Sequence, residues 1–344
     1  MASDSMVKNI FTSFFKALFG VIGLGCGFIV LIIMMSLLFS KPNAVQHQTS
    51  PKVLPDDRWK LEIFSHEAPT ILRVDISGVI GLDSLRKEDI LEQLIESQDG
   101  VLKSGQVKGI IVNINSPGGI ADDADAIYRM LLEYKRRYKV PVIAYVEGLC
   151  ASGGMYIACA ADKIYATQDS IIGHVGVLMS PPFFNFSKLM ERLGVESKTM
   201  YAGKDKDEMN PFRPWNPGEG ASFQRIVNFM YDRFVGIVAQ HRPKLTKESL
   251  LEQGAQIYPA PQAEELGYID QSISSFEDVL KNFATELGIH DDYQFVQLER
   301  SNFFEELFGT RAEMLWSSKI EHRLRLPGDL DPDLYGKTLY LYHP

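Results

Sequence analysis

The stretch VKGIIVNINSPGGI, residues 107–120, decides the fold. Its first eight residues, 107–114, form a short apolar run of the kind that predicts a buried strand. Asn-Ser-Pro-Gly-Gly follows at 115–119, and a pattern with helical spacing begins at Asp122. A strand, a glycine turn and a helix in direct succession predict a βα crossover unit.

The same rhythm continues on both sides of this stretch. Further strands are expected at residues 70–80, 141–146 and 163–166, and helices at residues 88–97, 122–138 and 150–161. Beyond Pro211 the chain becomes helical, with expected helices at residues 221–240, 247–253 and 260–266. Alternating strands and helices with crossover connections predict an α/β fold.

The N-terminal part reads as a membrane anchor. Residues 17–40 contain no charged side chain, and a helix of that length, about 36 Å, is long enough to cross a hydrocarbon core of about 30 Å. The run is also longer than the apolar region of a signal peptide. We expect a short tail at residues 1–16, a transmembrane anchor at 17–40 and a proline-rich linker at 41–57.

A globular domain is expected at residues 58–290, followed by a C-terminal extension at 291–344 that has no clear period. The net charge is −9 and the chain lacks a long basic stretch, which argues against binding nucleic acid. The three cysteines show no metal-ligand spacing, and no phosphate-binding loop is present, so no metal or cofactor is expected. Cys150 and Cys159 read as buried free thiols.

Two turns could carry chemistry. Gly118 and Gly119 follow one strand, where backbone N–H groups could hold a developing oxyanion. Ser152 follows another strand and precedes Gly153, whose N–H could supply a second donor. Ser152 is a candidate nucleophile, although a lone serine at that place could simply cap a helix.

A serine nucleophile needs a base, and the sequence offers two kinds. His174 lies close to the motifs, and a Ser-His arrangement through it is one option. A neutral lysine is the other, with Lys163, Lys204 and Lys206 as candidates. The spacing of these residues along the chain does not choose among them.

Four short motifs together resemble the signal peptide peptidase A family of serine–lysine peptidases. They are Asn-Ser-Pro-Gly-Gly at 115–119, Ala-Ser-Gly-Gly at 151–154, Ala-Ala-Asp-Lys-Ile at 160–164 and Gly-His-Val-Gly-Val at 173–177. The resemblance extends over about residues 71–275. It implies the Clp protease/crotonase-like fold, a spiral of ββα units, here with one N-terminal transmembrane helix.

The resemblance also implies roles for individual residues. Ser152 corresponds to the family nucleophile. In the family the lysine precedes a proline by a few residues, and counting back from Pro211 places it on Lys206, with Lys204 as the shifted alternative. The oxyanion amides are expected at Gly119 and Gly153.

The family further implies an enzyme of the inner membrane that crosses it once and has an extracytoplasmic catalytic domain. Balanced lysines and arginines around the anchor leave its orientation open. The implied substrates are cleaved signal peptides, and the implied assembly is a homo-oligomer in which serine and lysine can come from different chains. Two alternatives remain: a crotonase-like acyl-CoA enzyme and a catalytically inactive membrane scaffold.

Overall fold

The computed structural model describes residues 2–39, 49–82, 85–180, 182–289, 292–300 and 338–341. The chain forms two compact units, Met1–Gln46 and His47–Pro344. The first contains the helix α1 (Ala2–Phe39). Within it, Ser13–Ile32 is long and apolar enough to cross a membrane, with a mean hydropathy of 2.2. The helix expected for the anchor is therefore present, and its described apolar side chains are exposed.

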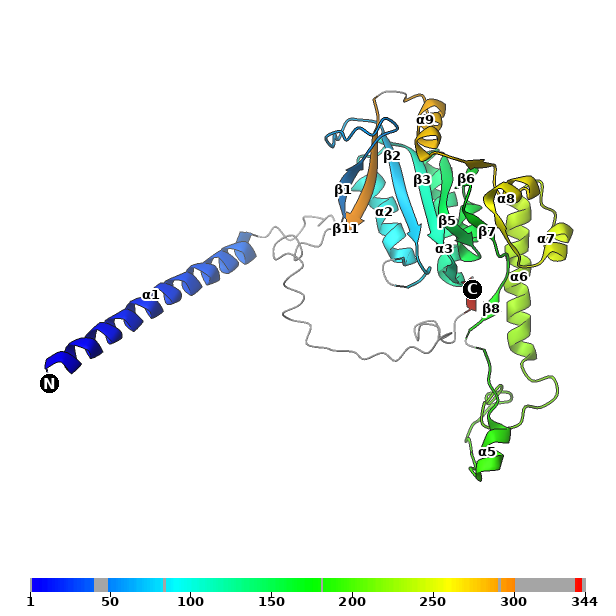
Figure 1. The fold of residues 1–344 in the computed structure, drawn as a ribbon, viewed down its shortest axis with the longest axis horizontal. Coiled ribbons are helices and arrows are strands. Elements are labelled where there is room, and N and C mark those ends of the chain that lie inside the picture. The colour runs from blue at the N-terminus through cyan, green and yellow to red at the C-terminus, as the bar shows by residue number, and fades with distance from the viewer. Residues whose placement is uncertain are drawn as a thin grey trace. The chain divides into compact units, whose positions relative to one another are not determined.

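The second unit is built on a mainly parallel sheet with the strand order β1-β11-β2-β3-β5-β6-β10 (Figure 1). The edge strand β1 runs antiparallel to β11, and β7 and β9 extend the sheet beside the end of β5. The strands are β1 (Thr49–Leu54), β2 (Thr70–Ser77), β3 (Val107–Ser116), β5 (Val142–Ala151), β6 (Lys163–Thr167), β7 (Ile171–Gly173), β9 (Ile257–Pro259), β10 (Gln271–Ile273) and β11 (Gln294–Arg300).

Apolar side chains of β2 alternate between the two faces of the sheet. Leu72 belongs to the larger core, which the helices α2 (Lys87–Asp99) and α3 (Ala121–Tyr138) cover. Ile71 belongs to a separate core on the opposite face, under the helix α9 (Phe276–Glu286). Because both faces are covered, the strands read as continuous apolar runs rather than as alternating ones.

The expected strands at 70–80, 107–114, 141–146 and 163–166 are confirmed as β2, β3, β5 and β6. The expected helices are confirmed as α2, α3 and the short α4 (Gly153–Ala158), followed by α6 (Ala221–His241), α7 (Lys247–Gln253) and α8 (Ala260–Leu266). The α/β class predicted from the rhythm of strands and helices is therefore confirmed.

Two expected boundaries differ from the structure. The expected linker at 41–57 contains β1, whose Pro51 is tolerated because it lies in an edge strand. The expected C-terminal extension at 291–344 contains β11, which lies inside the sheet between β1 and β2. Both strands are short, and polar residues interrupt their apolar pattern, so only pairing with distant partners defines them.

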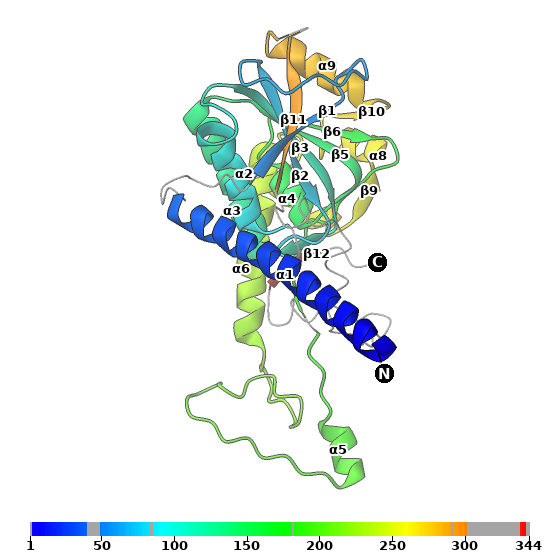
Figure 2. The same ribbon diagram turned by 90° about the vertical axis from the view of Figure 1, so that its left-hand side faces the viewer.

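A second, three-stranded sheet lies beside the first and has the order β4-β12-β8. Its strands are β4 (Gly118–Ile120), β8 (Leu178–Met179) and the C-terminal β12 (Thr338–Leu341). Residues 182–220, which we call the arm, connect β8 to α6 and include the short helix α5 (Ser187–Leu193). Both ribbon views show α5 beyond the end of α6, away from the sheets (Figures 1 and 2).

Candidate active site

Ser152 forms the turn between the end of β5 and the start of α4. Its backbone has φ 54° and ψ −115°, which residues with a Cβ rarely adopt. Its N–H donates to the carbonyl oxygen of Gly173 at 2.9 Å, and its carbonyl oxygen accepts from the N–H of Tyr156 at 3.0 Å. Non-glycine residues held in rare conformations cluster at functional sites. The backbone conformation of Ser152 is therefore one that is typical of a functional site.

The side chain of Ser152 does not behave as a helix cap. It makes no capping hydrogen bond to α4. Instead, its hydroxyl group donates to the carbonyl oxygen of Gly176 over a long 3.4 Å, a weak contact that a reacting serine could give up. The alternative that Ser152 caps the helix is therefore wrong. Its hydroxyl group makes only this weak hydrogen bond and remains a candidate nucleophile.

The residues around Ser152 are small because α4 packs closely on the end of β3. A Cβ on Gly154 would lie 3.1 Å from the carbonyl oxygen of Ser116. Cys150 and Cys159 are buried free thiols, as expected. Burial raises the pKa of the Cys150 thiol and raises that of Cys159 to about 12. Both remain protonated at neutral pH, so neither is a ready nucleophile.

Gly119 lies in β4 where the chain passes very close to Ile80. The N–H of Ile80 donates to the carbonyl oxygen of Gly118, and the N–H of Ile120 donates to the carbonyl oxygen of Ile80, both at 2.8 Å. A Cβ on Gly119 would lie 2.1 Å from that same Ile80 oxygen. In such a parallel bridge the polar groups of the middle residue point the other way. The N–H of Gly119 therefore faces the opposite edge of β4.

Lys204 and Lys206 lie together on the arm, and both side chains are exposed. The loop that carries them is held by Arg213, which pairs with Asp207 at 2.6 Å and with Glu219 at 2.7 Å. The described hydrogen bonds of Ser152 involve no lysine. The structure of one chain thus orders the lysine loop without joining it to the serine.

Lys163 is not a suitable base. It forms an ion pair with Glu286 at 2.6 Å, and the hydrogen bond to that carboxylate raises the pKa of Lys163. It also pairs in register with Ile143, near the start of β5, whereas Ser152 follows the end of that strand. Lys163 is thus held in its charged form, and it lies at the opposite end of β5 from Ser152.

His174, by contrast, lies next to the serine turn. The strand β7 pairs with the end of β5, so that Gly173 lies opposite Ala151. His174 follows directly, with φ 53°, and its N–H donates to the carbonyl oxygen of Gln256 at 2.7 Å. The side chain is half-buried, and burial lowers its pKa from the ordinary 6.5. His174, whose imidazole is neutral at pH 7, therefore directly follows the strand residue that pairs beside the serine turn.

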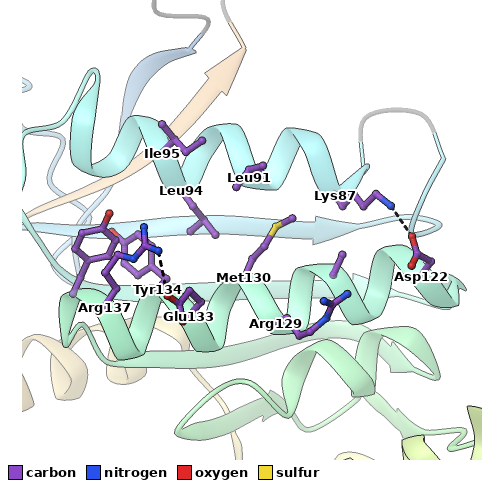
Figure 3. A pocket seen from close by; sticks show the side chains of 12 residues that line it. Lys87, Leu91, Leu94, Ile95, Asp122, Arg129, Met130, Glu133, Tyr134 and Arg137 are labelled. Carbon is purple, nitrogen blue, oxygen red and sulfur yellow. Dashed lines mark hydrogen bonds and ion pairs between the residues drawn. The ribbon is translucent and has the colours of Figure 1, made fainter.

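Other features of the described residues lie apart from this site. No group of three or more histidine, cysteine, aspartate or glutamate side chains among them could hold a metal ion. A groove of about 510 Å³ runs between α2 and α3, with apolar walls that include Leu91, Leu94 and Met130 (Figure 3). Lys87 and Asp122 pair at one end of it, at 2.6 Å. The residues that line this groove include neither Ser152 nor a candidate base.

The fold and the serine turn define the class: an α/β protein with a serine at the turn between a sheet strand and a short helix. The chain matches the Clp protease family over residues 77–173 and Peptidase family S49 over residues 134–290. Ser152 lies in both matched ranges, Gly119 in the first and Lys206 in the second. The chain is also similar to a ClpP1 variant from Listeria monocytogenes, at 19% identity and a TM-score of 0.38, over 63% of this chain and 96% of that one.

Curated relatives agree with the family match. The chain is 29% identical to a putative signal peptide peptidase SppA of Enterococcus faecium, over 78% of this chain and 81% of that protein. It is 30% identical to a putative protease of Synechocystis, over 64% of this chain and 76% of that protein. It is 37% identical to a putative protease of Methanocaldococcus jannaschii, over 53% of this chain and 57% of that protein. The chain belongs to peptidase family S49 of the signal peptide peptidase A type and is a serine peptidase.

Proposed function

We propose that this chain is a membrane-anchored endopeptidase with a Ser152–Lys206 dyad that cleaves residual signal peptides or other membrane-derived peptides. The observation that carries the proposal is the backbone of Ser152, held at φ 54° at the start of α4, with Gly119 in the neighbouring β4. Neither a capping role nor ordinary turn geometry accounts for that conformation.

In the proposed mechanism the Ser152 hydroxyl oxygen attacks the carbonyl carbon of the scissile peptide bond. Lys206, in its neutral form, takes the hydroxyl proton and later delivers it to the leaving amine. The N–H groups of Gly119 and Gly153 stabilise the oxyanion. Water then attacks the acyl-enzyme, and the lysine serves as its base. No metal or other cofactor enters these steps.

The dyad requires a second copy of the chain in this proposal. Lys206 is exposed on the arm, whereas a lysine base must lose water to become neutral near pH 7. The arm also exposes a set of large apolar side chains: Phe183, Phe184, Phe186, Leu189, Leu193, Val195, Met200 and Phe212. Exposed apolar clusters of this size mark protein contacts. Packing the arm against a neighbouring copy would cover both the apolar side chains and the lysine.

The N-terminal anchor supports membrane-derived peptides as the proposed substrates. The helix α1 contains a candidate span at Ser13–Ile32, and one relative is named a putative signal peptide peptidase. An enzyme held at the bilayer meets apolar peptides where they accumulate. We place the chain in the inner membrane, with one span and the catalytic domain on the extracytoplasmic side.

Covalent labelling tests the nucleophile directly. A biotinylated phosphonate that reacts with activated serines is expected to modify the detergent-solubilised protein at Ser152, as identified by peptide mass spectrometry. The matched control is Ser152→Ala, which should remain unlabelled while Cys150→Ala still reacts. A crotonase-like acyl-CoA enzyme or an inactive scaffold would leave Ser152 unmodified in the folded protein.

The pH profile distinguishes a lysine base from His174. Either base acts only in its neutral form. Because burial lowers the pKa of His174 below 6.5, a histidine base would give a kcat/KM that is level above about pH 7. An ordinary lysine has a pKa of about 10.4, so a lysine base predicts a kcat/KM that keeps rising into mildly alkaline pH. We expect the second profile.

Folding must be followed at each pH. The unfolded chain binds a proton at His174 more tightly than the folded chain does, so this group contributes stability that is present above about pH 6.5 and is lost below it. Circular dichroism at each pH separates this loss from loss of the base. A level profile that disappears in a folded His174→Ala variant would assign the base to His174.

A further inference from the structure

The connection between β1 and β2 exposes three large apolar side chains at alternate positions. Trp59, Leu61 and Ile63 have exposed fractions of 78%, 66% and 94%. We call residues 56–64, which carry them, the tryptophan loop; in Figure 1 it belongs to the blue connection beside β1. Clusters of exposed apolar side chains mark sites of contact with proteins or membranes. The tryptophan loop is therefore a candidate contact surface.

Hydrogen bonds hold the backbone of this loop in one shape. Asp56 is buried, and its carboxylate accepts from the N–H of Arg58 at 2.9 Å and from the N–H of Lys60 at 2.8 Å. The N–H of Asp56 donates to the carbonyl oxygen of Lys60 at 3.0 Å. The hydroxyl group of the buried Tyr293 donates to the carboxylate of Asp57 at 2.7 Å. The apolar side chains are thus presented to solvent by an ordered turn.

Trp59 has a backbone conformation that is rare for a bulky residue. Its φ is 62°, in the left-handed region. Its N–H donates to the carbonyl oxygen of Asp56 at 3.1 Å, and Phe64, at the end of the loop, packs against the larger core. Rare conformations that the surrounding structure maintains are typical of functional positions. Here that conformation leaves the largest apolar side chain of the loop exposed.

The charged side chains of the loop suit contact with a neutral, apolar partner. Lys60 pairs with Glu62 at 2.6 Å, and Arg58 lies 3.5 Å from Asp56. The loop therefore has no excess of positive charge with which to attract anionic groups. Tryptophan beside aliphatic side chains is typical of surfaces that enter the boundary between lipid headgroups and acyl chains. The chemistry of the loop fits a lipid surface.

The position of the loop along the chain favours the bilayer over a soluble partner. The candidate span ends at Ile32, and β1, which precedes the loop, begins at Thr49. The chain between these two residues reaches at most about 60 Å, at about 3.5 Å per residue. A span in the bilayer thereby keeps the loop near that bilayer. Tethering of this kind gives the lipid surface a high effective concentration.

We propose that the tryptophan loop is a second membrane contact, in which Trp59, Leu61 and Ile63 enter the headgroup region of the bilayer that holds the anchor. The inference rests on the proposed membrane anchoring and adds a lipid-binding surface on the catalytic domain itself. Two contacts, one through the span and one through the loop, limit how the domain can turn about its tether. The proposed active site is then held in a restricted range of orientations to the membrane.

Fluorescence quenching by lipids tests the contact in the full chain. A thiol-reactive fluorophore is attached to Leu61→Cys in a Cys26→Ser background, where the remaining cysteines, Cys150 and Cys159, are buried. The protein is reconstituted into phosphatidylcholine vesicles in which some acyl chains carry a nitroxide near the headgroup. Because a nitroxide quenches only at short range, we expect strong quenching of the probe at position 61. Ile63→Cys provides a second probe position in the same loop.

Two further probe positions serve as controls. Leu251→Cys lies on α7, with an exposed fraction of 54%, and α7 lies at the opposite end of the sheet from β1 (Figure 1). Its probe should be quenched severalfold less than the probe at position 61. The native Cys26 lies within the candidate span and is exposed. A probe on Cys26 of the otherwise unchanged chain should be quenched strongly.

Each outcome decides between the loop and the anchor. Quenching at Cys26 without quenching at position 61 would overturn the inference alone. In that case, blue-shifted emission at position 61 would mean that the loop packs against protein, such as a second copy, and unshifted emission would mean that it faces water. Equal quenching at positions 61 and 251 would also overturn the inference. Absence of quenching at Cys26 would reject the proposed membrane anchoring, and the inference with it.

A double substitution tests whether the apolar side chains make the contact. Trp59→Gly removes the indole and suits the positive φ, and Ile63→Ser changes a side chain that is almost wholly exposed. Together they are expected to lower quenching at position 61 severalfold, whereas the matched control Leu251→Ser should leave it unchanged. Unchanged quenching in the folded double variant would contradict the inference. So would quenching that appeared only after phosphatidylglycerol was added to the vesicles, because charge would then make the contact.

Discussion

Ser152→Ala and Lys206→Ala are each expected to lower kcat/KM for peptide hydrolysis by on the order of 10⁴-fold or more. The reason is that a nucleophile and its base act as one unit. Loss of either leaves only substrate binding and the oxyanion donors, so the double variant should be little worse than either single one. The measurement is hydrolysis of a fluorogenic peptide by the detergent-solubilised protein.

Matched controls make this result specific. Lys204→Ala removes a neighbouring lysine that is also exposed on the arm, and should retain most of the activity. Cys150→Ala changes a buried residue two positions before the serine and should also remain active. If Lys204→Ala were inactive and Lys206→Ala active, the base would move by two residues. If only Ser152→Ala and His174→Ala were inactive in folded proteins, the lysine dyad would be wrong.

Mixing two inactive variants is expected to restore activity. In a closed homo-oligomer, the Lys206 of one copy would meet the Ser152 of its neighbour. A Ser152→Ala copy still carries the lysine, and a Lys206→Ala copy still carries the serine. With random exchange at equal amounts, about one quarter of the interfaces would join an intact serine to an intact lysine. The mixture should then show about a quarter of wild-type activity, a large gain over two inactive parents.

The mixing experiment depends on assembly and exchange, which are measured separately. Light scattering is expected to show a homo-oligomer, and energy transfer between differently labelled copies reports exchange. An oligomer that exchanges without regaining activity would place the serine and lysine in one chain. An active monomer would remove the role of the arm altogether. Replacing Phe184 and Leu193 on the arm with serine should weaken assembly, because both side chains are exposed in the single chain.

The strands and helices around the serine could be predicted because their signals are local. The strand β3 is a continuous apolar run with a glycine turn after it, and α3 has helical spacing over its whole length. A strand that is buried on both faces of a parallel sheet needs a continuous apolar run. A helix that packs on one side of that sheet needs apolar residues at helical spacing. Ser152 was found in the same way, from the small residues that follow a predicted strand.

The strands β1, β11 and β12 could not be predicted in this way. Each is short, and each forms only because distant segments pair with it: Val53 lies opposite Val296, and Tyr340 lies opposite Gly119. Main-chain pairing of this kind leaves little trace in a single strand, since β propensity depends on the neighbouring strands. The alternation of residues 338–341 could have suggested a strand, but not the partner that it covers.

The sequence by itself determined the apolar N-terminal helix, the order of strands and helices, and the serine between two glycine turns. Those features follow from hydrophobic periodicity and from the small side chains that tight turns need. Only the tertiary structure decided the strained backbone of Ser152, the neighbouring position of His174, the ion pair that removes Lys163, and the exposure of Lys206. Conformation, desolvation and charge pairing arise from residues that are far apart along the chain, so they exist only once the fold has brought those residues together.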